Sequence, residues 1–172
     1  MNILFYHPAN YLEIGIPQGI AILSAVLKEQ GHRVDLFDTA FTKPKGYKAK
    51  QNAMMAGPTI YKRTEYTIED LVSCDPEADR EAGFQKKIDE CRPDLVAVST
   101  MTTNYESAIE TLKKVNTRCP IIMGGVHPTI SPDEVIAEEK IDMLCIGEGE
   151  DALSELCRAI EGGKDYTTIK NL

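Results

Sequence analysis

Short apolar runs alternate with amphipathic segments along most of the chain. Five runs of strand length predict β-strands at residues 2–6, 33–37, 94–99, 121–123 and 142–146. Apolar residues at helical spacing, Ile20, Leu23 and Leu27 among them, follow the first run. They predict a helix over residues 17–30, and Gly31 is suited to close it.

Capping signals precede the later helical patterns. Asp75 stands before a proline that suits the first helical position, and residues 103–106 and 131–134 have the Ser/Thr-x-x-Glu pattern of a capping box. Apolar stripes at helical spacing are formed by Ala108, Leu112 and Val115 and by Leu153, Leu156 and Ile160. Each later strand is therefore expected to follow a helix.

Strands and helices that alternate in this way predict a doubly wound α/β fold, flavodoxin-like or Rossmann-like, with helices on both faces of a five-stranded parallel sheet. We expect the strand order 2-1-3-4-5 and one domain over residues 1–161. An irregular insertion at residues 40–73 shows no clear period. Its basic and apolar residues fit either a solvated surface insertion or a segment that packs on a ligand or a neighbouring domain. Residues 162–172 are expected to be an extended linker.

Composition excludes several classes of function. The 172-residue chain has a formal net charge of -8 and a pI near 4.9, which argues against a nucleic-acid partner. Its five cysteines are widely spaced without a C-x-x-C pair, as expected for reduced thiols in a cytoplasmic protein that carries no iron–sulfur cluster of its own. No apolar run approaches the roughly 20 residues that span a bilayer, so we expect no membrane partner.

The third strand leads into a loop rich in hydroxyl groups. In open parallel sheets, ligands bind beyond the carboxyl ends of the strands. This loop contains Ser99, Thr100, Met101, Thr102 and Thr103. Its hydroxyls, next to a helix N-terminus, can bind a phosphate or a heterocycle nitrogen. Capping explains only Thr103, so residues 99–102 are predicted ligand contacts.

Glycines follow the fourth and fifth strands. Gly124 and Gly125 would let a flat ligand lie against the backbone, although a tight turn would also explain them. His127 has no partner at metal-site spacing, so it is either a structural residue or a hydrogen-bond donor to the bound molecule. In the next turn Glu148 is expected to face the ligand, whereas the helix dipole explains Glu150. No metal ligand and no catalytic residue is predicted.

Taken together, residues 16–38, 93–99, 124–129 and 147–150 resemble the N-terminal cobalamin-binding domain of cobalamin-dependent radical S-adenosylmethionine enzymes. Their order and spacing cover most of the chain outside residues 40–73. The resemblance implies that the nucleotide tail of cobalamin enters between Ser99-Thr-Met101 and Gly124-Gly125, with the corrin ring across the strand ends. It also implies that the tail or the ring edge contacts His127, Thr129, Gly147, Glu148 and Gly149.

The chain departs from one pattern of the wider cobalamin-binding fold. The loop after the first strand lacks the D-x-H-x-x-G motif whose histidine binds cobalt in many methyltransferases and mutases. The resemblance therefore implies a base-off cofactor without a protein histidine ligand, with Tyr11, Leu12 or Ile14 beneath the ring. It further implies a separate C-terminal radical domain that binds the iron–sulfur cluster and S-adenosylmethionine and acts as a methyltransferase or a cyclase. The present chain would bind the cofactor without turnover of its own.

Other classes with the same sheet order fit less well. A signalling receiver domain needs acidic residues after the first strand, an aspartate after the third and a lysine after the fifth, where this chain has His7, Ser99 and Gly147. The phosphate loop of a flavodoxin and the G-x-G-x-x-G of a nicotinamide-binding domain are absent after the first strand. The remaining alternative is a non-catalytic flavodoxin-like interaction module that binds no cobalamin.

Overall fold

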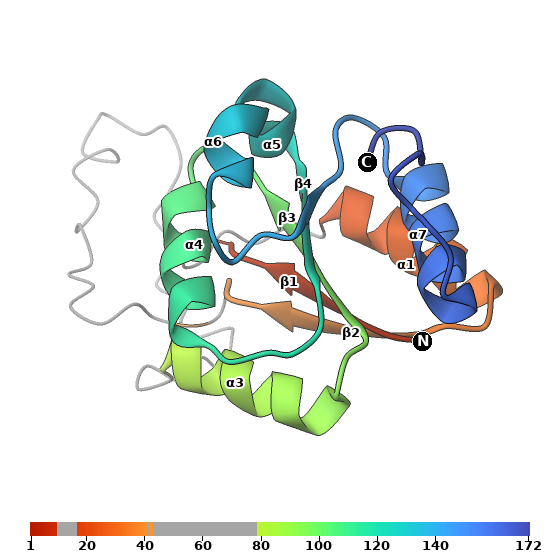
Figure 1. Cartoon of the computed structure of the whole chain (residues 1–172). Helices are drawn as coiled ribbons and strands as arrows, with labels where there is room; N and C mark the ends of the chain where they lie inside the picture. The colour runs from red at the N-terminus through yellow and green to blue at the C-terminus, as the bar shows by residue number, and fades with distance from the viewer. Residues whose placement is uncertain (10–16, 41, 43–78) are drawn as a thin grey trace, which may run out of the picture.

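The computed structural model describes residues 1–9, 17–40, 42 and 79–172. Five parallel strands form one sheet: β1 (Asn2–His7), β2 (Arg33–Asp38), β3 (Leu95–Thr100), β4 (Ile121–Gly125) and β5 (Met143–Leu144). Their order is β2-β1-β3-β4-β5, which confirms the predicted topology (Figure 1). In the register of β3 and β4, Ser99 lies opposite Gly124 and Thr100 opposite Gly125. The loops that follow these strands therefore leave the sheet at one edge.

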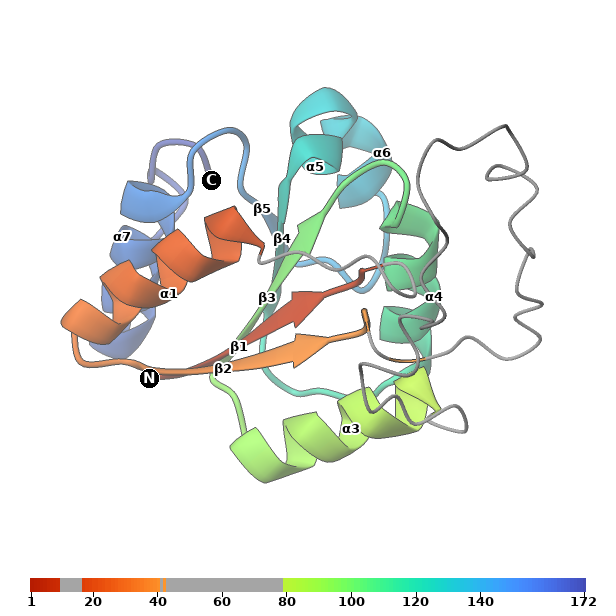
Figure 2. The ribbon, with the colours of Figure 1, turned by 180° about the vertical axis from the view of Figure 1, so that it is seen from behind.

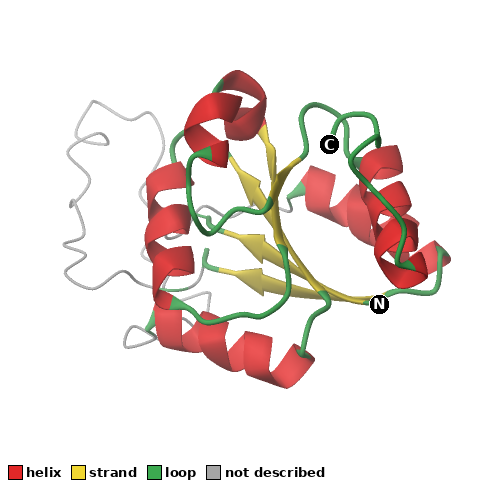
Figure 3. Cartoon of the chain, in the orientation of Figure 1, coloured by secondary structure: helices red, strands yellow, loops and turns green. Residues whose placement is uncertain are grey.

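Helices cover both faces of the sheet, as Figures 2 and 3 show. One face carries α1 (Gln18–Glu29) and α7 (Glu150–Gly162), and the other carries α3 (Arg80–Cys91) and α4 (Tyr105–Lys114). Two short helices, α5 (Val126–Ile130) and α6 (Pro132–Ile136), lie between β4 and β5. In the described parts of the chain, no helix has the length and apolar character needed to cross a membrane.

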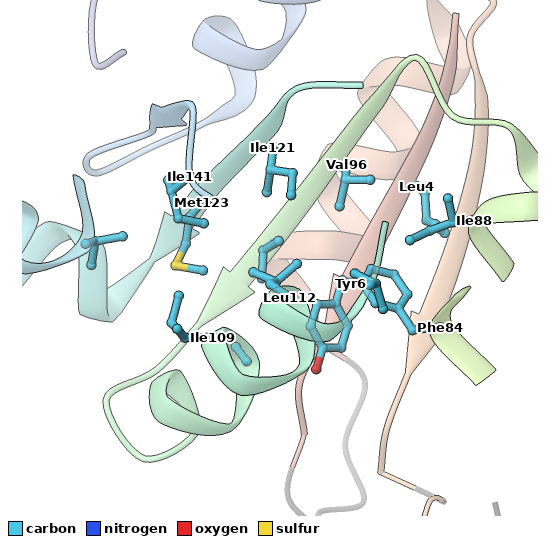
Figure 4. Close-up of a cluster of buried hydrophobic side chains, with 14 of the residues drawn as sticks. Leu4, Tyr6, Phe84, Ile88, Val96, Ile109, Leu112, Ile121, Met123 and Ile141 are labelled. Atoms are coloured by element: carbon cyan, nitrogen blue, oxygen red, sulfur yellow. The ribbon is translucent and has the colours of Figure 1, made fainter. Parts of the chain in front are cut away.

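Side-chain alternation along the strands divides the core into two clusters. On β1, Tyr6 faces α3 and α4, whereas Phe5 faces α1 and α7. Under α3 and α4, Phe84 stacks on Tyr6 with ring centroids 4.5 Å apart (Figure 4). Phe84 also stacks on Phe37, with ring centroids 5.0 Å apart. We call this packed set the aromatic cluster. The other face, under α1 and α7, contains the pocket described below.

Helix ends differ in detail from the predicted caps. Gly31 follows the C-cap residue of α1 with φ of +85°, in agreement with its predicted role. The N-cap of α3 is Asp79, which accepts hydrogen bonds from the amides of Glu81 and Ala82. The predicted capping box at residues 103–106 is wrong, because the N-cap of α4 is Asn104, whose side chain instead accepts from the amide of Met101. Ser131 is the N-cap of α6, as predicted, but its side chain makes no capping hydrogen bond.

Residues 163–172, the C-terminal segment, pack back onto the domain in turns, with hydrogen bonds from the amide of Ile169 to Tyr166 and from that of Leu172 to Ile169, so the segment is not extended as expected. Its role as a linker stays a prediction. Ile169 and Leu172 contact the core under α1 and α7. Apolar side chains within this polar segment account for the return of the chain. Three predictions concern residues outside the described part of the chain. They are the insertion from residue 43 onward, the cap at Asp75, and the placement of Tyr11, Leu12 or Ile14 beneath the corrin ring.

Candidate cofactor-binding pocket

A pocket with a volume of about 140 Å³ lies between the sheet and the helices α1 and α7, at the carboxyl ends of the strands. Its floor is apolar and is formed by Phe5, Leu23, Ala97, Ile122 and Leu153. These side chains belong to the core under that face of the sheet. An apolar floor below a rim of backbone groups suits a flat, mainly apolar group with a polar extension.

Six of the predicted site residues line this pocket: Ser99, Gly124, Gly125, Gly147, Glu148 and Gly149. Residues 146–149, the rim loop, follow β5 and form one side of the mouth. A Cβ atom at Gly149 would lie at an ordinary contact distance of 3.5 Å from the side chain of Leu23. Glycine at these positions leaves the backbone of the rim loop free of side chains.

Gly125 has a backbone conformation that only glycine adopts readily. Its φ of 103° and ψ of -163° lie in the region that is almost exclusive to glycine. A Cβ atom there would lie 2.6 Å from the carbonyl oxygen of Thr100, on the neighbouring strand. This glycine is therefore required by the path of the chain, whatever the pocket binds. At Gly124 a Cβ would make ordinary contacts of 3.5 Å with Cys145.

This difference between adjacent glycines gives a direct prediction for stability. Gly125→Ala is expected to lower the free energy of unfolding by about 2–3 kcal/mol, because the backbone region costs alanine about 1–3 kcal/mol before the contact with Thr100. Gly124→Ala should change it by less than about 1 kcal/mol, since glycine within a strand is not favoured. Urea denaturation followed by circular dichroism measures the free energy of unfolding of both variants. Equal losses for the two would contradict the claim that the backbone at Gly125 requires glycine.

The other predicted residues of the β3 loop do not line the pocket. By strand alternation, Thr100 faces the same side as Val98, whose side chain packs under α3 and α4. Its hydroxyl is buried and has no hydrogen-bond partner among the described residues. Met101 is 40% exposed at the end of β3, and Thr102 is also exposed. The loop thus brings Ser99 alone into the pocket.

The side chains of His127 and Thr129 lie outside the pocket and contact neighbouring protein groups. The His127 ring is buried against Tyr105, with ring centroids 4.0 Å apart, and its Nε2 lies 3.7 Å from a carboxylate oxygen of Glu134. The Thr129 hydroxyl donates to the carbonyl oxygen of Gly125 at 2.9 Å and accepts from the amide of Gly147 at 3.1 Å. Thr129 therefore ties the end of β4 to the rim loop.

Cys145 is a pocket residue that sequence reasoning missed. It lies at the end of β5, is 8% exposed and lines the pocket beside Gly124 and Gly149. Burial raises the pKa of its thiol above the ordinary value, and the nearby charge of Glu150 acts in the same direction. The thiol is therefore neutral near pH 7 and contributes to the apolar floor. Across the described residues, no three His, Cys, Asp or Glu side chains are grouped to hold a metal ion.

Fold and pocket together define a flavodoxin-like domain with a pocket at the carboxyl edge of its parallel sheet, the edge where ligands bind in such folds. The sequence profile of the B12 binding domain matches residues 59–157, more than half of the chain. The chain belongs to the B12-binding domain family.

Two curated relatives match parts of the chain. It is 36% identical over 80 residues to an anaerobic magnesium-protoporphyrin IX monomethyl ester cyclase from Cereibacter sphaeroides, a match that covers 44% of this chain and 13% of the cyclase. It is 32% identical over 84 residues to the enzyme of the same name from Rubrivivax gelatinosus, which covers 46% of this chain and 15% of that enzyme. The matched part is a small fraction of the length of both relatives.

Solved structures share the fold over nearly the whole chain. The radical S-adenosylmethionine methyltransferase TsrM from Kitasatospora setae, with cobalamin and an iron–sulfur cluster bound, superposes with a TM-score of 0.69 at 18% identity. That match covers 98% of this chain and 26% of TsrM. The cobalamin-dependent S-adenosylmethionine radical enzyme OxsB, with aqua-cobalamin bound, gives a TM-score of 0.63 at 17% identity, covering 98% of this chain and 20% of OxsB.

Proposed function

We propose that this chain is the cobalamin-binding domain of a larger radical S-adenosylmethionine enzyme. The single observation that carries the proposal is the pocket under α1 and α7, at the carboxyl ends of the strands. Membership of the B12-binding domain family supports the choice of cofactor. The cyclases and the two cobalamin-bound enzymes, which are several times longer than this chain, support a multidomain protein.

The pocket fits the nucleotide end of cobalamin. Its volume of about 140 Å³ is close to that of a cavity of roughly 150 Å³ that takes up benzene, so it has room for the six-membered ring of a benzimidazole, with the fused five-membered ring toward the mouth. The apolar floor would contact the ring, and the backbone around Ser99 and Gly124 would contact the polar remainder of the tail. Glu148 and its flanking glycines would then lie along the tail at the mouth.

The corrin ring would lie outside this pocket, over the strand ends. Met101 is exposed there and is our candidate for contact with the ring edge. The Thr100 side chain, which faces the other side of the sheet, would not touch the cofactor, and the side chains of His127 and Thr129 would act on it only through the loops that they contact. Thr102, whose hydroxyl lies 3.4 Å from the Nδ1 atom of His127, belongs to the same group.

A base-off cofactor without a protein histidine ligand is part of the proposal. Insertion of the benzimidazole into the pocket removes it from cobalt. The buried His127 ring lies against Tyr105 and is not among the pocket residues, which supports a histidine-off state. Bound cobalamin would supply methyl transfer or another radical step, as in a methyltransferase or a cyclase. This chain would supply binding and orientation only.

The partner in this scheme is a C-terminal radical domain of the same protein. It would bind the iron–sulfur cluster and S-adenosylmethionine and would provide the substrate contacts. We place the enzyme in the cytoplasm, because its cysteines have the spacing of reduced thiols and the described ones are free. Alone, the present chain is expected to bind cobalamin and to show no turnover.

Reconstitution tests this function directly. Mixing the purified protein with hydroxocobalamin and removing the excess by desalting should leave about one cobalamin per chain, visible in the absorption spectrum. Cobinamide, which lacks the nucleotide tail, should bind about five hundredfold more weakly, because burial of an aromatic group of about 150 Å² contributes about 4 kcal/mol. Colourless protein after desalting would favour the interaction module instead.

The axial ligand is tested on the same sample. After reduction to cob(II)alamin, the electron paramagnetic resonance spectrum should show no superhyperfine splitting from an axial nitrogen. A nitrogen triplet would contradict the histidine-off, base-off state. Equal affinity for cobalamin and cobinamide would contradict the inserted tail while leaving cobalamin binding in place.

A further inference from the structure

The C-terminal segment returns to the pocket mouth. After α7 the chain runs back along the domain, and its end lies beside the loop that follows β5 in both views (Figures 1 and 2). Ile169 and Leu172 anchor the segment by packing on the core under α1 and α7. The segment therefore brings polar groups to the rim loop, residues 146–149.

Asn171 binds the rim loop twice. Its carbonyl oxygen accepts a hydrogen bond from the amide of Ile146 at 2.9 Å. Its side-chain amide donates to the carbonyl oxygen of Glu148 at 3.0 Å. On the other side of the loop, the amide of Gly147 donates to the Thr129 hydroxyl at 3.1 Å. Three consecutive residues of the rim loop are thus held by groups from outside it.

The backbone of Asn171 is in the left-handed region, with φ of 70°. Non-glycine residues enter this region at a cost, and asparagine tolerates it better than most because its short side chain can form local hydrogen bonds. Such a conformation persists where the surrounding contacts determine it. At Asn171 those contacts are the two hydrogen bonds to the rim loop, so the conformation and the contacts depend on each other.

We propose that Asn171 is a positioning residue for the pocket: it fixes the rim loop in the form that retains the cofactor. This inference rests on the proposed function for the identity of the ligand. Because the rim loop lines the pocket, a ligand that fits the held form also stabilises the docking of the C-terminal segment. By linkage, docking of the C-terminal segment strengthens ligand binding by the same factor as ligand binding strengthens docking. A bound ligand therefore also affects any group that the segment contacts.

Three variants separate the contribution of the Asn171 side chain from that of its left-handed backbone. Asn171→Ala removes the side-chain donor and also disfavours the left-handed backbone, whereas Asn171→Gly removes the donor and keeps that backbone accessible. Thr167→Ala is the matched control in the same segment, because the Thr167 hydroxyl donates to Asp165 and not to the rim loop. Each variant is loaded with hydroxocobalamin, and the dissociation constant is measured from the absorption change.

We expect Asn171→Ala to weaken cobalamin binding about tenfold and Asn171→Gly about threefold, as for the loss of one or two net hydrogen bonds. Thr167→Ala should bind like the unmodified chain. Hydrogen exchange of the cobalamin-free protein provides a second readout: the amide of Ile146 should exchange faster in Asn171→Ala. Cobalamin added to the unmodified chain should slow exchange within residues 163–172.

The outcomes distinguish the two proposals. If the unmodified chain retains no cobalamin, the proposed function fails, and the hydrogen-exchange comparison still tests the hold of Asn171 on the rim loop. If the unmodified chain binds cobalamin and Asn171→Ala binds it equally well, the positioning role is wrong. Unchanged exchange at Ile146 in Asn171→Ala would also overturn it.

Discussion

Gly124→Leu is expected to abolish cobalamin retention while the domain remains folded. A Cβ atom at this position makes ordinary contacts with Cys145, so the backbone accepts a side chain. Gly124 also lines the pocket of about 140 Å³, and a leucine there would occupy space proposed for the benzimidazole. Loss of that buried contact corresponds to about a hundredfold weaker binding or more. Absorption spectra after desalting measure the loss.

A matched control is the same replacement at an exposed site. Gly162→Leu lies at the end of α7, where an added Cβ would meet only the flexible side chain of Lys164. It should leave cobalamin retention unchanged, and Gly124→Ala should give an intermediate affinity. Far-ultraviolet circular dichroism establishes that each variant is folded. Full retention by a folded Gly124→Leu variant would exclude the inserted tail.

Phe84→Ala is expected to lower the free energy of unfolding by about 3–5 kcal/mol, the range found for a buried phenylalanine truncated to alanine. Phe84 is 0% exposed and stacks on both Tyr6 and Phe37 within the aromatic cluster. Its removal leaves a cavity between α3 and the sheet that these rings cannot fill without breaking their own contacts. Chemical denaturation monitored by circular dichroism is suitable, because the chain contains no tryptophan.

The control for this change is an aromatic residue at the surface. Tyr166 is 37% exposed, and Tyr166→Ala should change stability by less than about 1 kcal/mol. If Phe84→Ala were no more destabilising than Tyr166→Ala, the aromatic cluster would not be the packing unit described above. Residual cobalamin binding by Phe84→Ala under folding conditions should stay close to normal, since its ring lies on the face opposite the pocket.

The sheet could be predicted from sequence because buried parallel strands appear as short apolar runs separated by helical periods. Its order was confirmed, whereas the cap of α4 was not. Asn104 and Thr103 are both good capping residues, and the choice between them depends on the path of the β3 loop, which lets Asn104 bind the amide of Met101. Sequence spacing alone does not contain that path.

For the pocket, the glycines carried more information than the hydroxyls. A glycine at a strand end has no side chain and leaves space on either face of the sheet. Gly124 and the rim-loop glycines were therefore predicted correctly as pocket residues. A hydroxyl must also face the right side, and the alternation that sends Val98 under α4 sends Thr100 with it. The same argument applied to β5 would have identified Cys145. Nothing in the sequence indicated the role proposed for Asn171, because its contacts with the rim loop form only when the C-terminal segment folds back.

The separation of the aromatic cluster from the pocket, on opposite faces of one sheet, makes the domain suitable for engineering. Residues beneath α3 and α4 can be repacked for heat tolerance if Val98 is kept, because Val98 belongs to that cluster and also lines the cavity. If the proposed function holds, residues beneath α1 and α7 can be varied in a library to accept corrinoids with different lower bases. The two searches can run separately, and their best sequences can then be joined in a single gene.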